Sequence, residues 1–226
     1  MIKVGSINDI EKQFIKNLGN GEESKVGLLK DKTHIAKIFH SPKFINEKDI
    51  ILMGKDLDQS SFAFFKDIYS CNDIIYGAIA DYVEGEDLSQ KILSVPYIDI
   101  LYSLIKLRKD IKTISDANIL VSDIKPFNTK YTNYYITIVD TGRFTYSNMD
   151  KDKLYEHNLE MVYSLIRMTM KENIYFKQLL NHEKKLSEGF KNNDTFPNFF
   201  SDLQKYTSEV VGNNINSFDE YVNYIK

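Results

Sequence analysis

The chain has 226 residues, of which 42% are hydrophobic and 27% charged, so it can form one sizeable core or two small lobes around a cleft. Its net charge is −3, and the lysines are interspersed with acidic residues, which argues against a nucleic-acid-binding surface. The single cysteine, Cys71, excludes an internal disulfide, and no Cys/His cluster indicates a structural metal.

Membrane association is not expected from the sequence. No apolar run approaches the roughly 18 residues of a transmembrane helix, and the opening residues lack the apolar segment of a secretory signal. We therefore expect a cytoplasmic protein, acting in its own cell or in a host cell after delivery by a specialised secretion machine. The sequence leaves the oligomeric state open.

The N-terminal third is predicted to be mostly β-structure. Residues 15–40 alternate short apolar runs with a glycine-rich turn and a polar turn at Lys30–Lys32, a pattern typical of antiparallel hairpins. Ser41 as N-cap and Pro42 at the first helical position then predict a helix over residues 41–57. Two further strands are expected, at 62–70 and 74–83, on either side of a polar turn.

From residue 97 the hydrophobic period becomes helical. Residues 97–114 have apolar side chains at helical spacing, namely Ile98, Leu101, Leu104, Ile105 and Ile111. After an apolar strand, "YYITIV", residues 154–170 and 173–190 are amphipathic, and Ser217 with Glu220 forms a capping-box pattern. We expect an α+β fold in one domain, with a β-rich N-lobe over 1–82 and a helical C-lobe over 83–226.

The stretch "SDIKPFN" and the strand after it carry a pattern typical of phosphoryl transfer. Asp123 can orient a hydroxyl, Lys125 can offset charge on the moving phosphoryl group, and Asn128 with Asp140 can hold Mg²⁺. Upstream, the turn "GNGEESKV" lies between two predicted strands, and its glycines would let backbone N–H groups approach phosphates closely.

In this order, the residues from about Leu18 to Met170 resemble the protein kinase family. Gly19, Gly21 and Val26 match its glycine loop, with Ser24 in place of the third glycine. The resemblance implies a two-lobed kinase-like fold with a reduced C-lobe, and ATP and Mg²⁺ as cofactors. Its departures from the family pattern resemble the shortened kinases of some bacteria and their viruses, including effector kinases that lack an activation loop.

The resemblance also implies roles for individual residues. Lys37 would grip the α- and β-phosphates and pair with Glu47, while the backbone of Asp81 to Val83 would contact adenine. Ala80 would be the gatekeeper, and its small side chain is expected to admit ATP analogues with bulky N6 groups. Asp123 would be the catalytic base, with Asn128 and Asp140 on the metal.

Several positions depart from the family pattern. Val121 and Ser122 replace the usual His-Arg pair, and no Ala-Pro-Glu segment follows Gly142, so the platform for a peptide substrate is expected to be reduced. Met161 takes the place expected for the aspartate that ties down the catalytic loop, so that anchor is expected to be missing.

The form Asp-x-Lys-Pro-x-Asn favours a protein Ser or Thr hydroxyl as acceptor. Two other functions remain open. A kinase-shaped module that recruits a protein partner is suggested by the reduced platform and by the acidic loop tip at Glu22 and Glu23. A small-molecule phosphotransferase is suggested by the missing activation segment, and Lys125 followed by Pro126 argues against it.

Overall fold

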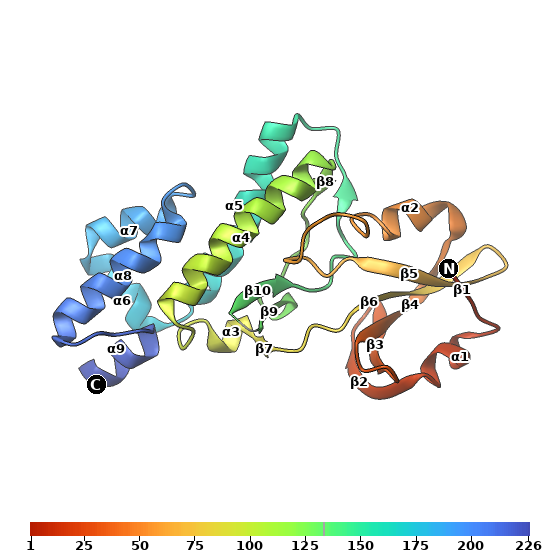
Figure 1. Cartoon of the computed structure of the whole chain (residues 1–226), viewed down its shortest axis with the longest axis horizontal. Helices are drawn as coiled ribbons and strands as arrows, with labels where there is room; N and C mark the ends of the chain where they lie inside the picture. The colour runs from red at the N-terminus through yellow and green to blue at the C-terminus, as the bar shows by residue number, and fades with distance from the viewer. Residues whose placement is uncertain (133) are drawn as a thin grey trace.

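A computed structural model of the chain describes residues 1–132 and 134–226 and has an α+β fold (Figure 1). The N-terminal part is built around a six-stranded sheet in the order β1-β5-β6-β4-β3-β2. Its strands are β1 (Ile2–Lys3), β2 (Phe14–Asn20), β3 (Ser24–Leu29), β4 (His34–Phe44), β5 (Phe65–Cys71) and β6 (Ile74–Asp81). A short helix, α1 (Ile7–Glu11), connects β1 to β2.

The hairpins predicted from the alternation of apolar runs and polar turns are confirmed. Strands β2, β3 and β4 pair antiparallel in sequence order, and β5 pairs antiparallel with β6. The β5–β6 turn places Asn72 and Asp73 at φ values of 47° and 62°. Asn and Asp tolerate this left-handed region better than most residues, because their short side chains can hydrogen-bond locally.

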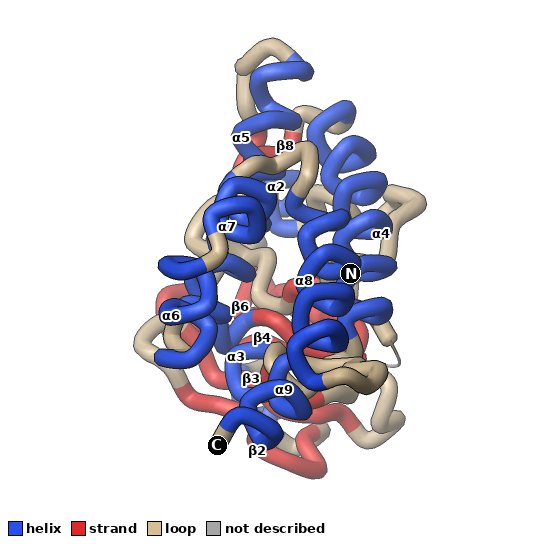
Figure 2. The backbone as a smooth tube through the Cα atoms, turned by 90° about the vertical axis from the view of Figure 1, so that its left-hand side faces the viewer, coloured by secondary structure: helices blue, strands red, loops and turns tan. Residues whose placement is uncertain are grey.

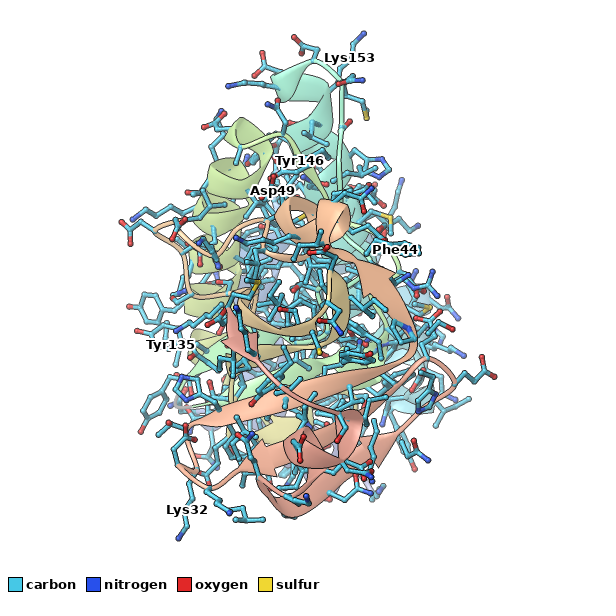
Figure 3. All side chains as sticks on the ribbon, turned by 90° about the vertical axis from the view of Figure 1, so that its right-hand side faces the viewer. Lys32, Phe44, Asp49, Tyr135, Tyr146 and Lys153 are labelled. Atoms are coloured by element: carbon cyan, nitrogen blue, oxygen red, sulfur yellow. The ribbon has the colours of Figure 1, made fainter. Side chains whose placement is uncertain are left out.

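The helix predicted from Ser41 is wrong at its start. Strand β4 continues to Phe44 and pairs again with β6 after an irregularity between Ile38 and Lys43, so Pro42 falls where its missing N–H costs no regular ladder bond. The helical turns come later, as a 3₁₀ turn η1 (Ile45–Glu47) and α2 (Lys48–Ile51). Phe44 ends the strand as an exposed side chain at the edge of the molecule (Figure 3).

The C-terminal part is mainly helical, as predicted. Its helices are α3 (Leu88–Lys91), α4 (Tyr97–Asp116), α5 (Lys151–Lys171), α6 (Ile174–His182), α7 (Lys184–Lys191), α8 (Phe196–Val211) and α9 (Phe218–Ile225). Helix α4 packs against α5 and α8, and α8 also contacts α7 and α9 (Figure 2). The face of α4 that packs is shifted from the predicted one, because Leu104 and Ile111 are buried but Ile98 and Ile105 are about half exposed.

The C-terminal aromatic residues largely form the core of this part. Phe176, Phe190 and Phe199 are buried and meet mostly edge to face, with ring centroids 5.1 to 6.1 Å apart. Such contacts add to the stabilisation that burial itself provides. Tyr224 is the exception, since it is exposed on α9.

Short strands lie where the sheet meets the helices. A three-stranded sheet has the order β10-β9-β7, formed by β7 (Glu86–Asp87), β9 (Thr129–Thr132) and β10 (Tyr135–Ile138). A 3₁₀ turn, η2 (Pro126–Asn128), precedes β9, and β8 (Ile119–Leu120) pairs with β11 (Thr145–Tyr146). Backbone hydrogen bonds from Ile138 to Ser61 and from Ala63 to Ile138, of 2.8 and 2.9 Å, tie β10 to the segment before β5. Among the helices of the described residues, none is long and apolar enough to cross a membrane.

Candidate functional site

A cleft of about 580 Å³ lies between the six-stranded sheet and the C-terminal part. Ten of the residues singled out from the sequence line it: Gly19, Gly21, Ser24, Val26, Lys37, Ala80, Asp81, Val83, Asn128 and Asp140. Glu47, Asp123 and Lys125 are not among its lining residues. A larger hollow of about 710 Å³, beside Ser201 and Asn214, is a shallow surface depression and contains none of the residues predicted to act in chemistry.

The six-stranded sheet supplies one wall of the cleft. The turn between β2 and β3 is closed by a hydrogen bond of 2.9 Å from the Gly21 amide to the Ser24 carbonyl. A Cβ added at Gly19 would meet no atom within 4 Å, so packing within the chain does not require glycine there. Lys37 lies on β4 opposite Val26 of β3 and Ala78 of β6, and these pairings fix its place in the middle of the sheet.

Lys37 and Asp140 form an ion pair across the cleft. The Lys37 side chain is mostly buried, whereas that of Asp140 is partly open to solvent. Asp140 has φ 61°, a left-handed conformation that a non-glycine residue adopts at some energetic cost. Its neighbours hold it there, because Thr141 is buried and donates to the Ala63 carbonyl at 3.2 Å.

The β9–β10 hairpin brings Asn128 and Asp140 to the same part of the cleft. The amide of Val139 donates to the Asn128 carbonyl at 2.8 Å, so the residue before Asp140 is fixed to Asn128. Among the described residues, no group of three or more His, Cys, Asp or Glu side chains could hold a metal alone. One carboxylate and one amide oxygen do fit Mg²⁺, which typically takes one or two carboxylates and completes its shell with phosphate and water oxygens.

Glu47 does not pair with Lys37, contrary to the expectation. Its carboxylate instead accepts a hydrogen bond of 3.0 Å from the Phe44 amide. This bond caps the N-terminus of the 3₁₀ turn that contains Glu47. The cause is local, since the extension of β4 delays the helix until Lys48 and leaves Glu47 in the 3₁₀ turn. Lys37 has Asp140 as its partner in place of Glu47.

Asp123 and Lys125 lie together on the loop between β8 and η2, with Lys125 Nζ 3.5 Å from Asp123 Oδ1. Both side chains are about half exposed. Asp123 also has a left-handed φ, 51°. Ser122 takes the place of the expected arginine and joins this loop to the segment after Asp140, because its Oγ donates to the Arg143 carbonyl at 2.5 Å.

The loop has an anchor after all, and the expectation that Met161 leaves it without one is wrong. Asn158 of α5 is fully buried and accepts a hydrogen bond of 2.8 Å from the Val121 amide. It also donates to the Ile119 carbonyl and the Ser115 hydroxyl, at 2.8 and 2.9 Å. Met161 lies one helical turn further on and packs against the core.

The acidic tip of the β2–β3 turn is bound to the opposite side of the cleft. Arg143 Nε donates to Glu23 Oε2 at 3.1 Å, and Arg143 Nη2 pairs with the other carboxylate oxygen. Arg143 directly follows the Asp140-Thr141-Gly142 stretch, so this contact links the glycine turn to the segment that carries Asp140. No local sequence pattern predicts this contact, because Glu23 and Arg143 are 120 positions apart in the chain.

No protein-family model matches the chain. No curated protein sequence is significantly similar to it.

Proposed function

We propose that this protein binds MgATP in the cleft and transfers the γ-phosphoryl group to a Ser or Thr hydroxyl of a protein, as a small protein kinase-like enzyme. One observation carries the proposal. The glycine turn, Lys37, the end of β6, Asn128 and Asp140 come from distant parts of the chain and line one cavity. These are the kinds of groups that bind a nucleotide and its metal ion in phosphoryl transfer.

The end of the cleft near β6 suits an adenine base. Val26, Ile35 and Ala80 give it apolar walls. The amide of Val83 makes no hydrogen bond to any group in the described part of the chain, whereas the neighbouring Tyr82 amide donates to the Thr33 carbonyl at 2.8 Å. A free backbone donor between apolar walls is what a planar heterocycle with ring acceptors needs for orientation.

The opposite end of the cleft suits the phosphates. Asp140 and Asn128 would hold Mg²⁺, which supplies charge neutralisation on the phosphate oxygens. Lys37, now paired with Asp140, would turn its ammonium toward the α- and β-phosphates. The open space at Gly19 leaves the backbone of the turn accessible to phosphate oxygens.

The acceptor hydroxyl would meet Asp123. This carboxylate would orient the hydroxyl and accept its proton, and Lys125, 3.5 Å away, would offset charge on the transferred group. A protein acceptor is favoured by the Lys125-Pro126 pair. The single cysteine, Cys71, cannot form an internal disulfide, which is compatible with action in a reducing cytoplasm.

A binding module that recruits a protein partner is the second candidate. It is favoured by the Lys37–Asp140 pair, in which the lysine and the carboxylate proposed to bind phosphate and metal bind each other, and by the pairing of Glu47 with the Phe44 amide in place of Lys37. A module of this kind would have little use for nucleotide, so nucleotide binding separates the two functions.

A thermal-shift titration with ATP, with and without Mg²⁺, tests the proposal. Ligand that binds the native state raises the melting temperature, with a stabilisation of about 2.7 kcal/mol at a hundredfold excess over Kd. We expect a Mg²⁺-dependent rise in the wild type, its loss in Asp140→Asn, and its retention in Asp49→Asn. Asp49 is an exposed carboxylate on α2 that does not line the cleft, and it serves as the matched control.

Two results would count against the proposal. If millimolar MgATP leaves the wild type unshifted, the binding module becomes the better account. If Asp140→Asn responds like the wild type, the metal does not use Asp140. With binding established, comparing phosphorylation of mixed proteins with that of small hydroxylated compounds decides the acceptor class.

A further inference from the structure

One wall of the cleft contains two neighbouring residues of very different size. Ala80 of β6 lies directly opposite Phe65 of β5 in the antiparallel ladder. Directly opposite residues project from the same face of a sheet with their Cβ atoms close together. Both line the cleft, and both are almost completely buried, with exposed fractions of 2% and 5%.

The Phe65 ring fills the space that a small residue at position 80 would otherwise leave. It belongs to an apolar cluster with Leu52, Ile68 and Ala78 between the sheet and α2. It also packs edge to face against Phe39, with ring centroids 6.4 Å apart. A ring held on several sides in this way cannot swing aside without disturbing the close packing of its neighbours.

The ring extends from the sheet toward the phosphate end of the cleft. Its Cε2 atom lies 3.4 Å from the point where a Cβ on Gly142 would stand, and Lys37 Nζ lies 3.6 Å from that same point. Phe65 therefore bounds the cleft from Ala80 to the Lys37–Asp140 pair, and Thr141 points away to its hydrogen bond with Ala63.

We propose that Phe65, and not Ala80, limits the depth of the base-binding part of the cleft and excludes nucleotides with bulky groups on the exocyclic amine. The inference rests on the proposed function, since it concerns the nucleotide of that same site. A base seated against Val83 presents its amino edge to Ala80, and the ring of Phe65 blocks the space beyond. This reverses the expectation drawn from the small side chain at position 80.

The test compares ATP with N6-benzyl-ATP, each with Mg²⁺, by thermal shift and by competition with a fluorescent nucleotide. We expect the wild type to bind N6-benzyl-ATP at least tenfold more weakly than ATP. Phe65→Ala should shift the ratio of the two affinities at least tenfold toward N6-benzyl-ATP. Phe65→Leu should show a smaller shift of this ratio in the same direction, and it tests the inference if Phe65→Ala does not fold.

Phe64→Leu is the matched control. Phe64 is the adjacent residue and equally buried, but it packs against Phe62 and Phe144 and does not line the cleft. An equal shift of the ratio in Phe64→Leu and Phe65→Leu would mean general loosening of the fold and would overturn the inference. Equal binding of ATP and N6-benzyl-ATP by the wild type would also overturn it and would restore Ala80 as the limiting residue. Failure of the wild type to bind either nucleotide would overturn the proposed function, and this inference with it.

Discussion

Asn158 is the buried polar residue on which the backbone of the loop carrying Asp123 depends. Its amide group satisfies one donor and two acceptors: the Val121 amide, the Ile119 carbonyl and the Ser115 hydroxyl. A buried polar group left without a partner loses its hydration and gains nothing in return. The three bonds therefore fix the loop two residues before Asp123.

Replacing Asn158 with leucine, which has a similar volume, should destabilise the protein by about 3 kcal/mol. The reason is that the Val121 amide and the Ile119 carbonyl would each remain buried without a partner, at about 1–3 kcal/mol per group. Urea unfolding of both proteins measures the difference. Asn198→Leu, at an exposed position of α8, is the control and should change stability little. An equally small effect in Asn158→Leu would show that the loop does not need this anchor.

The residues that a local sequence pattern singled out lie together in the structure, while their roles stay predictions. Gly19, Gly21, Asn128 and Asp140 were found through their spacing, and they do line one cleft. Asn158 was missed because its partners, at residues 115 to 121, are some 40 positions away, and an asparagine inside a helix has no distinguishing local pattern. Long-range contacts of this kind can be found only when the packing of α5 against the loop is known.

At the scale of elements, helix α4 holds the segment before β5 through one carboxylate. Asp110 Oδ2 accepts hydrogen bonds from the Ser60 and Ser61 amides at 3.2 and 3.0 Å, from Ser61 Oγ at 2.6 Å, and from Lys106 Nζ at 2.9 Å. Burial alone would raise the pKa of Asp110, but the hydrogen bonds from Ser61, Lys106 and Ser60 outweigh it and lower the pKa below its ordinary value of 3.8.

This lowered pKa predicts an acid-dependent loss of stability. Asp110 binds a proton more tightly in the unfolded chain than in the folded chain. The stabilisation that ionised Asp110 provides is therefore complete above the ordinary pKa, and it is lost as the pH falls through the pKa of Asp110 in the folded state. Asp110→Asn should lower the free energy of unfolding by about 2 kcal/mol at pH 7, because it replaces charge-assisted hydrogen bonds. Urea unfolding at neutral and acidic pH should show the stabilities of the two proteins converging as the pH falls below the ordinary pKa of the carboxyl group.

The control for this prediction lies on the same helix. Asp116→Asn removes a carboxylate that pairs with Lys112 at the exposed surface, where solvent screens the pair and it contributes little to stability. If Asp110→Asn and Asp116→Asn have the same effect at every pH, the buried hydrogen bonds of Asp110 do not hold the segment.

The elements themselves were predicted with uneven success. The hairpins were correct, because apolar runs of strand length separated by turn residues have few alternative arrangements. The helix predicted to start at Ser41 was wrong because Lys43 and Phe44 pair with β6 instead. This strand pairing outweighs the local preference of Ser41 for a helix N-cap. The same displacement moved Glu47 away from Lys37, so one wrong element boundary led directly to one wrong contact in the site.

At the scale of the whole molecule, the sheet and the helical part are joined on both sides of the cleft. At the inner side, Ala63 and Ser61 bond to β10 through the backbone. At the outer side, Glu23 at the tip of the β2–β3 turn pairs with Arg143. The outer contact involves exposed side chains, so its stabilisation is at most about 1 kcal/mol, weak enough to open and close.

We expect the Glu23–Arg143 pair to slow the escape of bound nucleotide, because it closes the phosphate end of the cleft. Glu23→Arg and Arg143→Glu should each raise the dissociation rate of a fluorescent ATP analogue several-fold, and the double exchange should restore the wild-type rate. Glu23→Arg is the decisive variant. Through its charge alone, an added arginine near the phosphates would slow the release of the nucleotide. Faster release from Glu23→Arg would therefore come from the loss of the Glu23–Arg143 contact. Stopped-flow dissociation at low and high salt measures both effects, since salt weakens an exposed pair. Slower release from Glu23→Arg, or no rescue in the double exchange, would show that the pair does not close the cleft.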